Sequence, residues 1–230
     1  MKYFADTIIK PFIVERRYRK LCEIGASFGE NTSELLKTNP SSLTIIDPCL
    51  DADLKENYRT NKNVVVHQGL SLEVVPKLTE QFDCVLIDGD HNWYTVFNEL
   101  RLIEERGLLR DGGAIFLHDV SWPYGRRDMY YQVNTIPAEF IQPNAKKGIV
   151  RGESKLSDSG GINAEVNNAL FEGGSRNGVL TAVEDFMNLH PCKYKYLSSY
   201  REVGLGLLFK GGSFGKLRMV KWLLRFKSVK

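Results

Sequence analysis

The chain has 230 residues and a formal net charge of +3; 26% of its residues are charged and 43% are hydrophobic. This length suits one large α/β domain and is short for two full domains. No apolar run approaches the roughly 18 residues that cross a membrane, and the N-terminus lacks the basic start and apolar core of a signal peptide. The four cysteines have no metal-binding spacing, so we expect a cytoplasmic protein with reduced thiols.

Apolar runs alternate with helix-like stretches, a pattern typical of a mainly parallel sheet with helices on both faces. The expected strands are Lys20–Ile24, Leu43–Asp47, Val64–His67, Cys84–Asp88, Ala114–His118 and a closing antiparallel hairpin, Tyr194–Ser199 and Gly204–Phe209. The expected helices are Glu30–Lys37, Asp53–Tyr58, Leu72–Thr79, Tyr94–Arg106 and Thr181–Leu189. Residues 108–113 are expected to form a turn. The pattern predicts a doubly wound α/β fold with a seven-stranded sheet.

A loop of small residues, Gly25–Gly29, follows the first expected strand and precedes a helix. We expect its glycines to let the backbone approach a nucleotide-like ligand, where a Cβ would collide. The glycines are four residues apart, unlike the G-x-G-x-x-G spacing of dinucleotide sites. Glu23 would repel a pyrophosphate but suits a cationic ligand with an amino group, and Asp47 can accept hydrogen bonds from ribose hydroxyls. The loop therefore favours S-adenosylmethionine (SAM) over NAD, and a tight turn without a ligand is the alternative.

Four titratable residues follow two neighbouring strands: Asp88 and His91 after the fourth, and His118 and Asp119 at the end of the fifth. Because the carboxyl ends of parallel strands meet at one edge of a sheet, these side chains can converge. Carboxylates with an imidazole suit Mg²⁺ or Mn²⁺, which would chelate a pair of substrate hydroxyls and lower the pKa of one. We predict Asp88, His118 and Asp119 as metal ligands, and His91 as general base with Asp88 as a second catalytic residue.

Single acids at strand ends more often cap loops than carry chemistry. We interpret Asp83 and Asp90 in this way, and chance clustering is the alternative for the four titratable groups.

Residues 120–178 interrupt the alternation of strands and helices. The segment leaves the carboxyl edge of the sheet, and a loop of this length is usually a lid or a substrate platform. Its aromatic and guanidinium groups favour a polar, ring-shaped acceptor such as a sugar, or one bearing phosphate or carboxylate. The candidate acceptor-binding residues are Trp122, Tyr124, Arg126, Arg127 and Tyr130. A structural excursion held by cation–π contacts is the alternative.

The C-terminal tail, residues 211–230, is basic. Residues 216–230 carry six Lys or Arg and no acid, whereas the rest of the chain has 25 basic and 28 acidic residues. The basic charge therefore belongs to the tail and not to a nucleic-acid groove. Apolar residues recur there at helical spacing, so we expect an amphipathic helix. It fits three arrangements: on an anionic membrane surface, on a partner subunit, or as a terminal helix with a solvated face.

These motifs resemble class I SAM-dependent methyltransferases over roughly residues 18–210. Within them the chain is similar to the branch with an Ile-Asp-Gly-Asp-His motif, here Ile87–His91, which includes sugar O-methyltransferases and cephalosporin-hydroxylase-like proteins. The resemblance implies a Rossmann-like methyltransferase fold with a cofactor site on three loops. The residues that it implies for SAM are Glu23, Gly25, Ala26, Ser27 and Gly29 at the methionine part, Asp47 at the ribose, Gly69, Leu70 and Ser71 at the adenine, and Asp88.

In that branch, acids matching Asp88 and Asp119 bind Mg²⁺ and the histidine matching His91 is the base. The chain departs from its relatives at two of these positions. Leu70 stands where relatives often have an acid, which leaves Ser71 for polar contacts with adenine. His118 stands where some members have a metal-binding acid, so the identity and presence of the metal stay open.

The sequence thus predicts a SAM-dependent O-methyltransferase acting on a hydroxyl of a sugar or glycan intermediate, in polysaccharide or secondary-metabolite biosynthesis. We expect the domain to span residues 1–210, with residues 120–178 as the lid, and no nucleic-acid partner. Peripheral contact with the inner face of the membrane through residues 216–230 stays open, as does a homo-oligomer. The alternatives are an NAD(P)-dependent oxidoreductase on the same fold and a non-catalytic binding protein that docks through the tail.

Overall fold

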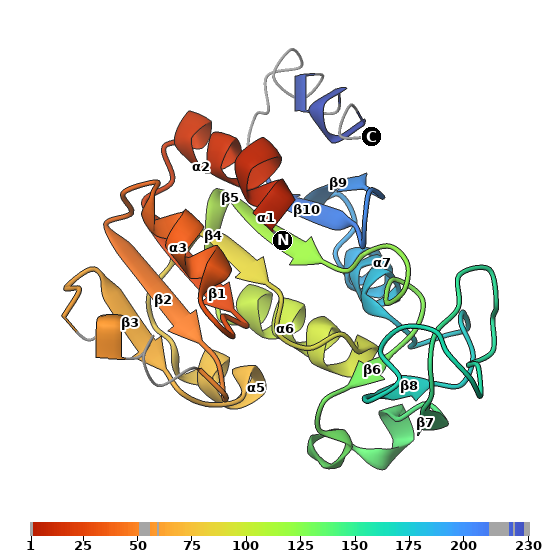
Figure 1. Cartoon of the computed structure of the whole chain (residues 1–230). Helices are drawn as coiled ribbons and strands as arrows, with labels where there is room; N and C mark the ends of the chain where they lie inside the picture. Colours follow the sequence, from red (N-terminus) through yellow and green to blue (C-terminus); the bar gives the residue numbers. More distant parts are fainter. Residues whose placement is uncertain (1, 51–55, 59, 212–220, 223, 228–230) are drawn as a thin grey trace.

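The computed structural model describes residues 2–50, 56–58, 60–211, 221–222 and 224–227. Within them, a seven-stranded sheet has the order β3-β2-β1-β4-β5-β10-β9 (Figure 1). Its strands are β1 (Lys20–Ile24), β2 (Ser42–Ile46), β3 (Val64–His67), β4 (Phe82–Ile87), β5 (Leu109–His118), β9 (Tyr194–Ser199) and β10 (Leu205–Lys210). All neighbours pair in parallel except β10, which is antiparallel to β5 and to β9. The predicted doubly wound, mainly parallel fold is confirmed.

Strand β5 begins earlier than predicted and includes the segment that we expected to be a turn. Leu109 pairs with Phe82, and the register then shifts so that Ala114 pairs with Cys84. Gly112 has a φ of +75° within this irregular stretch. The turn-forming residues are bulged out of a continuous strand, because the buried Leu109 and Phe82 extend the pairing beyond them.

Three predicted helices are present: α3 (Glu30–Leu36), α6 (Trp93–Glu105) and α7 (Val179–Leu189). The predicted helix 72–79 is instead divided into α5 (Ser71–Val74) and a 3₁₀ turn (Val75–Lys77), because Pro76 supplies no amide hydrogen to continue an α-helix. Of the predicted helix 53–58, residues 56–58 are helical and the others lie outside the described residues. Before β1, where the sequence pattern predicts no element, the structure has α1 (Lys2–Phe4), a π-helical segment (Ala5–Ile9) and α2 (Lys10–Arg16).

Helices cover both faces of the sheet (Figure 1). On one face, Phe12 of α2 belongs to the same buried cluster as Leu86 of β4. On the other, Leu100 of α6 and Phe186 of α7 belong to a cluster with Val85, the neighbour of Leu86 in the strand. Alternate strand residues thus serve opposite helical layers. Burial of each such side chain stabilises the fold by roughly 1.5–3 kcal/mol.

The insertion, residues 120–178, forms a separate three-stranded sheet in the order β6-β8-β7, beyond the ends of α6 and α7 (Figure 1). Its strands are β6 (Met129–Tyr130), β7 (Asn144–Lys146) and β8 (Asn167–Ala169). The carboxylate of Asp128, which is fully buried, accepts hydrogen bonds from the amides of Trp93 (2.7 Å) and Gly178 (2.6 Å) and from the Tyr130 hydroxyl (2.8 Å). Burial raises the pKa of Asp128 to about 6. One side chain therefore ties the insertion to the beginnings of both helices.

The described part of the tail packs on the N-terminal helices. Trp222 and Phe226 are buried in the same cluster as Phe12, and the rings of Trp222 and Phe12 meet edge to face with centroids 4.9 Å apart. Lys221 forms an ion pair with Glu15 at 2.7 Å. Residues 216–220, 223 and 228–230 of the predicted amphipathic helix lie outside the described residues. Among the residues that the structure does describe, no helix has the length and apolar character needed to cross a bilayer.

Candidate active site

The carboxyl ends of the four central parallel strands lie level at one edge of the sheet. Ile24 of β1 pairs with Ile46 of β2 and with Ile87 of β4, and Ile87 pairs with Leu117 of β5. The residues that come next in the four strands are Gly25, Asp47, Asp88 and His118. The buried apolar residues set the strand register, and the register places these four residues in one row.

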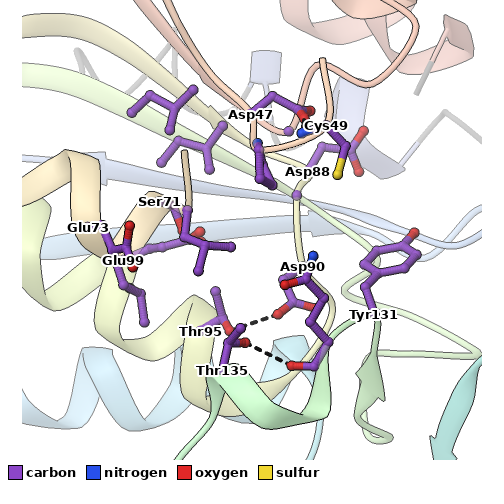
Figure 2. Close-up of a pocket in the computed structure, with 18 of the residues that line it drawn as sticks. Asp47, Cys49, Ser71, Glu73, Asp88, Asp90, Thr95, Glu99, Tyr131 and Thr135 are labelled. Carbon is purple, nitrogen blue, oxygen red and sulfur yellow. Dashed lines mark hydrogen bonds between the residues drawn. The ribbon is translucent and has the colours of Figure 1, made fainter. Parts of the chain in front are cut away.

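A cavity of about 500 Å³ opens at this edge, a size typical of small-molecule sites. Its walls come from the loops after β1, β2, β3 and β4, from α6 and from the insertion (Figure 2). Six of the residues predicted to bind SAM line it: Gly25, Ser27, Asp47, Leu70, Ser71 and Asp88. Ala26, Gly29 and Gly69 belong to the same loops but not to the cavity wall.

Gly25 is required by the packing of two loops on each other. It has a φ of +88°, and a Cβ there would lie 2.3 Å from the Cα of Gly89 and 2.4 Å from the carbonyl oxygen of Asp88. We expected the glycine to make room for a ligand. The structure gives a further reason: it allows the exits of β1 and β4 to touch.

The Asp47 carboxylate holds the loop after β1 in shape. One oxygen accepts hydrogen bonds from the amides of Ala26 and Ser27, both at 2.8 Å, and the other accepts from the amide of Cys49 at 2.7 Å. The side chain is buried against the loop and also lines the cavity. An ionised carboxylate offers about four acceptor sites, so the oxygen that accepts from Cys49 keeps capacity for a hydrogen bond from a ligand.

Glu23 lies behind the loop and not in the cavity wall. Its side chain is fully buried, and the Thr32 hydroxyl donates to it at 2.5 Å. Burial raises the pKa of Glu23 to about 8, against the opposing effect of the Thr32 hydrogen bond. At neutral pH the group is mainly uncharged. The expected contact between Glu23 and a ligand amino group stays a prediction.

The strand-end residues come together in one cluster, as predicted from their positions; His91 and Asp119 are buried, and Asp88 and His118 are half-buried. His118 Nδ1 lies 2.9 Å from an Asp88 oxygen and 2.8 Å from an Asp119 oxygen, and His91 Nδ1 lies 3.3 Å from the same Asp119 oxygen. Burial opposes a charge on His118, but the two carboxylates outweigh it and raise its pKa to about 10. Asn31 of α3 donates to the other Asp88 oxygen at 3.0 Å. Asp119 has a φ of +58°, which turns its side chain back toward the cluster.

The cluster offers a donor set for a divalent cation. One ligand atom each from Asp88, His118 and Asp119 lie within 4.8 Å of one another. Two carboxylates and an imidazole fit Mg²⁺ or Mn²⁺ in charge and in ligand type. A cation binding here would have to replace the proton that His118 shares with the two carboxylates.

His91 lies between this cluster and the insertion. Its ring stacks on Tyr124 with centroids 5.6 Å apart and planes 13° from parallel, and Tyr131 lies beside it at 6.0 Å. The main chain of His91 pairs with Met129 of the insertion. His91 is buried and is outside the cavity wall, which Tyr131 lines. The imidazole therefore stands behind Tyr131, in contact with the cluster through Asp119.

Two of the predicted acceptor-binding residues are used by the fold of the insertion. Arg127 is fully buried and donates to the carbonyl oxygens of Ala169 and, at 2.8 Å, of Ser154. Tyr130 is buried and donates its hydroxyl to Asp128. The geometry favours a structural role for both, because backbone groups of the insertion would otherwise lose their hydrogen-bond partners.

The other three predicted residues have different settings. Arg126 is half-buried and forms a two-pronged ion pair with Glu184 of α7, with both distances 2.6 Å. Tyr124 stacks on His91 and accepts a hydrogen bond from Asn163 at 2.6 Å. Trp122 lies under the Arg151 guanidinium, 4.6 Å from the ring centroid, and its buried indole nitrogen has no hydrogen-bond partner among the described residues. Tyr124 is buried and its hydroxyl also donates to Asn168 at 3.3 Å, whereas Trp122 is half-buried.

Sequence reasoning missed part of the cavity wall. Tyr131 lines it with 60% of its surface exposed, next to Tyr130, which points the other way. Tyr130 is the last residue of β6 and is buried, and Tyr131 comes directly after the strand. Asp90 also lines the cavity, and it accepts a hydrogen bond from Thr95 at 2.9 Å (Figure 2). The loop-capping role that we expected for Asp90 is confirmed by that bond and by one from the His91 amide at 3.0 Å.

Residues 22–120 match a family model described as a methyltransferase domain. This segment of the chain is therefore similar to a methyltransferase domain. The matched segment runs from β1 to the end of β5 and so contains the loops that form most of the cavity wall and the whole His–Asp cluster. A search of curated proteins finds no match to the chain.

Solved structures with a similar fold include three methyltransferases. A methyltransferase from Podospora anserina bound to S-adenosylhomocysteine (SAH) shares 14% identity, with 89% of this chain and 76% of that chain covered and a TM-score of 0.56. An O-methyltransferase from Streptomyces achromogenes involved in tomaymycin synthesis, in complex with SAM, shares 15% (90% and 79% covered, TM-score 0.53). A Bacillus cereus O-methyltransferase in complex with SAH shares 16% (89% and 79% covered, TM-score 0.53). With the domain match, this Rossmann-like fold supports the predicted class, a SAM-dependent methyltransferase.

Proposed function

We propose that this protein is a SAM-dependent O-methyltransferase that acts on a hydroxyl of a sugar or glycan intermediate. One observation carries the proposal: the cavity shares Asp88 with a cluster that contains His91. Asp88 lines the cavity and also pairs with His118, which pairs with Asp119, the partner of His91. A methyl donor in the cavity and a base behind Tyr131 would therefore flank one small volume.

In this proposal, each part of the cofactor has its own place along the cavity wall. The loop Gly25–Gly29, with Ala26 and Ser27, would hold the methionine part, and Asp47 would accept hydrogen bonds from the ribose. The loop Gly69–Ser71, with Leu70, would flank the adenine. Support comes from the cavity, which extends along all three of these loops (Figure 2). NAD is the alternative ligand for this cavity, and a titration with SAH and with NAD⁺ distinguishes the two.

His91 is the proposed general base. Its Nδ1 lies 3.3 Å from Asp119, so the proton on that nitrogen is directed to the carboxylate and Nε2 is left to accept a proton from the acceptor hydroxyl. SAM supplies the methyl group as a carbon electrophile. The protein has to align the hydroxyl oxygen with that carbon and to receive the proton, and Tyr124, stacked on the imidazole, fixes the plane of the ring.

Asp88, His118 and Asp119 would hold Mg²⁺ or Mn²⁺ if the enzyme is metal-dependent. A divalent cation at this place would bind two neighbouring hydroxyls of an acceptor and lower the pKa of the one to be methylated. A sugar provides such a pair of hydroxyls, so the three candidate metal ligands and the proposed sugar substrate are consistent with each other.

The domain boundaries follow from the same proposal. Residues 1–210 would form the methyltransferase domain and residues 120–178 its acceptor platform, to which Trp122 and Tyr131 contribute aromatic surface for a sugar ring. Residues 211–230 would form an appendage. Within the described part of that tail, Trp222 and Phe226 face the chain itself, which supports a terminal helix over the membrane-bound or subunit-bound arrangement.

The proposal is tested by methyl transfer from labelled SAM into a panel of nucleotide sugars and extracted glycans, with and without EDTA. We expect label in at least one hydroxyl-bearing carbohydrate, and loss of that label with EDTA if the cluster holds a metal. Absence of transfer to the whole panel, together with reduction of NAD(P)⁺ by one of its members, would favour an oxidoreductase. Absence of both, with no SAM binding, would favour the binding protein.

A further inference from the structure

Glu99 of α6 is a buried acid that neither the fold nor the proposed mechanism uses. Its side chain has no exposed surface, yet the residue lines the cofactor cavity. Neither carboxyl oxygen has a hydrogen-bond partner among the described residues. An unsatisfied buried polar group costs on the order of 1–3 kcal/mol, and most such groups in folded proteins have a partner. A ligand in the cavity is a partner that would remove this cost.

The place of Glu99 in the cavity narrows the choice of ligand group. Thr95 and Glu99 are four residues apart on α6, so they lie on one face of the helix, and both line the cavity. Figure 2 shows Glu99 grouped with Ser71 and Glu73, whereas Asp88 and Tyr131 lie across the cavity from it. Glu99 therefore belongs to the end of the cavity that is formed by the loop after β3, remote from the His–Asp cluster.

We propose that Glu99 recognises the adenine ring of the cofactor: one carboxyl oxygen accepts a hydrogen bond from the exocyclic amine, and the other donates its proton to the adjacent ring nitrogen. The inference deepens the proposed function and rests on it. Leu70 and Ser71, which precede and begin α5, supply an apolar surface and a hydroxyl at this end. The acidic group that is absent from position 70 comes instead from Glu99 of α6.

The protonation state of Glu99 agrees with this pairing. Burial raises the pKa of Glu99 to about 8, against the smaller opposing effect of the nearby Ser71 hydroxyl. A carboxyl group that keeps its proton at neutral pH offers a donor and an acceptor side by side, which is the arrangement that complements the amine and ring nitrogen of adenine. Glu73 lines the same end but is exposed, and water satisfies its carboxylate, so it serves as the matched control.

The test is calorimetric binding of two ligands, SAH and its 6-deamino analogue, in which purine replaces adenine. The wild-type protein is expected to prefer SAH by roughly 10- to 100-fold, since the analogue leaves a buried carboxyl oxygen without a donor. Glu99→Gln should keep this preference, because the amide also offers one acceptor and one donor. Glu99→Leu should reduce it to less than about threefold, and Glu73→Leu should leave it unchanged.

The outcomes separate this inference from the proposed function. If wild-type protein binds neither ligand, both fail. If it binds SAH but prefers it by less than about threefold, or if Glu99→Leu keeps the wild-type preference, the assignment of Glu99 is wrong and the proposed function stands. The preference is a ratio within one protein, so partial unfolding of a variant does not distort it. Should Glu99→Leu not fold, Glu99→Met replaces it with the same expected result, and the wild-type ratio decides on its own.

Discussion

The proposed cofactor cavity and the insertion meet at Tyr131, yet each region is stabilised by different interactions. The cavity is shaped by backbone pairing. The strand register sets where β1, β2 and β4 end, and the Asp47 carboxylate holds the loop after β1 in place. The insertion has strands of only two or three residues, and buried polar side chains replace the missing ladder. Those side chains are Arg127, Asp128, Asn168 and Asn177, and each is buried and bonded to backbone groups of the insertion or its flanks.

This difference teaches which polar residues are free to do chemistry. In a segment with little backbone pairing, buried charged and amide groups are needed to satisfy the main chain. The buried polar residues of the insertion are therefore structural, and our proposal gives acceptor binding to its aromatic surface. At the sheet edge the backbone is already satisfied by the strands, so the polar residues there can serve a ligand.

The largest effect is expected at the proposed base. His91→Ala should reduce turnover by roughly 10²- to 10⁴-fold while SAM binding remains, because the base acts on the acceptor and not on the cofactor. The measurement is steady-state methyl transfer to the best acceptor of the panel, with calorimetric SAM binding beside it. His67→Ala, at the end of β3, is the control. Full activity of the His91 variant would exclude His91 as the general base.

The contrast in how the two regions are held is tested at Asp128. Asp128→Ala leaves two buried amides and a hydroxyl without an acceptor, so it should lower the free energy of unfolding by about 3–5 kcal/mol. Urea unfolding followed by circular dichroism measures it. Asp158, an exposed acid of the same insertion, should tolerate substitution by Ala without a measurable change. Equal stability of the two variants would contradict a scaffold built on Asp128.

A pH series tests whether Glu23 is a neutral structural group. Its pKa is raised from 4.5 to about 8 in the folded protein, so between these values the folded state holds a proton that the unfolded chain releases. Glu23 therefore contributes stability that is complete below about pH 4.5 and is lost as the pH rises to about 8, by up to about 1.4 kcal/mol per pH unit. Glu23→Gln should lack this part of the slope in urea unfolding at several pH values. Parallel profiles would mean that Glu23 is ionised at neutral pH.

The smallest effect separates two adjacent tyrosines. Tyr131→Ala should weaken acceptor or cofactor binding by roughly 5- to 10-fold through lost aromatic contact, with the fold intact. Tyr130→Phe should leave binding unchanged and lower stability by about 1–3 kcal/mol, since it removes the hydrogen bond to Asp128 and the one that the hydroxyl accepts from the Gln142 amide. The KM values for acceptor and for SAM measure the first change and urea unfolding the second. Weaker acceptor binding by Tyr130→Phe, with unchanged binding by Tyr131→Ala, would indicate that Tyr130 is the acceptor-binding tyrosine.

The sheet and the row of residues at its edge were predictable from local patterns. Apolar runs located the strands, and the shared edge of parallel strands was enough to bring Asp88, His118 and Asp119 together. Gly25 was found by its position, although its packing against Gly89 could not be foreseen from one loop alone.

What the sequence did not reveal depends on contacts between distant segments. The hydrophobic residues of the helices before β1 pack against the sheet and against Trp222, which lies over 200 residues later in the chain. Arg127 resembles a ligand-binding residue until its partners, Ser154 and Ala169, are known. Glu99 reads as one more acid on an amphipathic helix, and only the cavity shows that the folded protein buries it without a partner.

Calorimetric titration of the purified protein with SAH and, separately, with NAD⁺ tests the central claim most directly. If the cavity at the ends of β1, β2 and β4 is the site of a methyl donor, SAH will bind to saturation at one molecule per chain and NAD⁺ will produce no binding heat. Saturation by NAD⁺ with none by SAH would contradict the account.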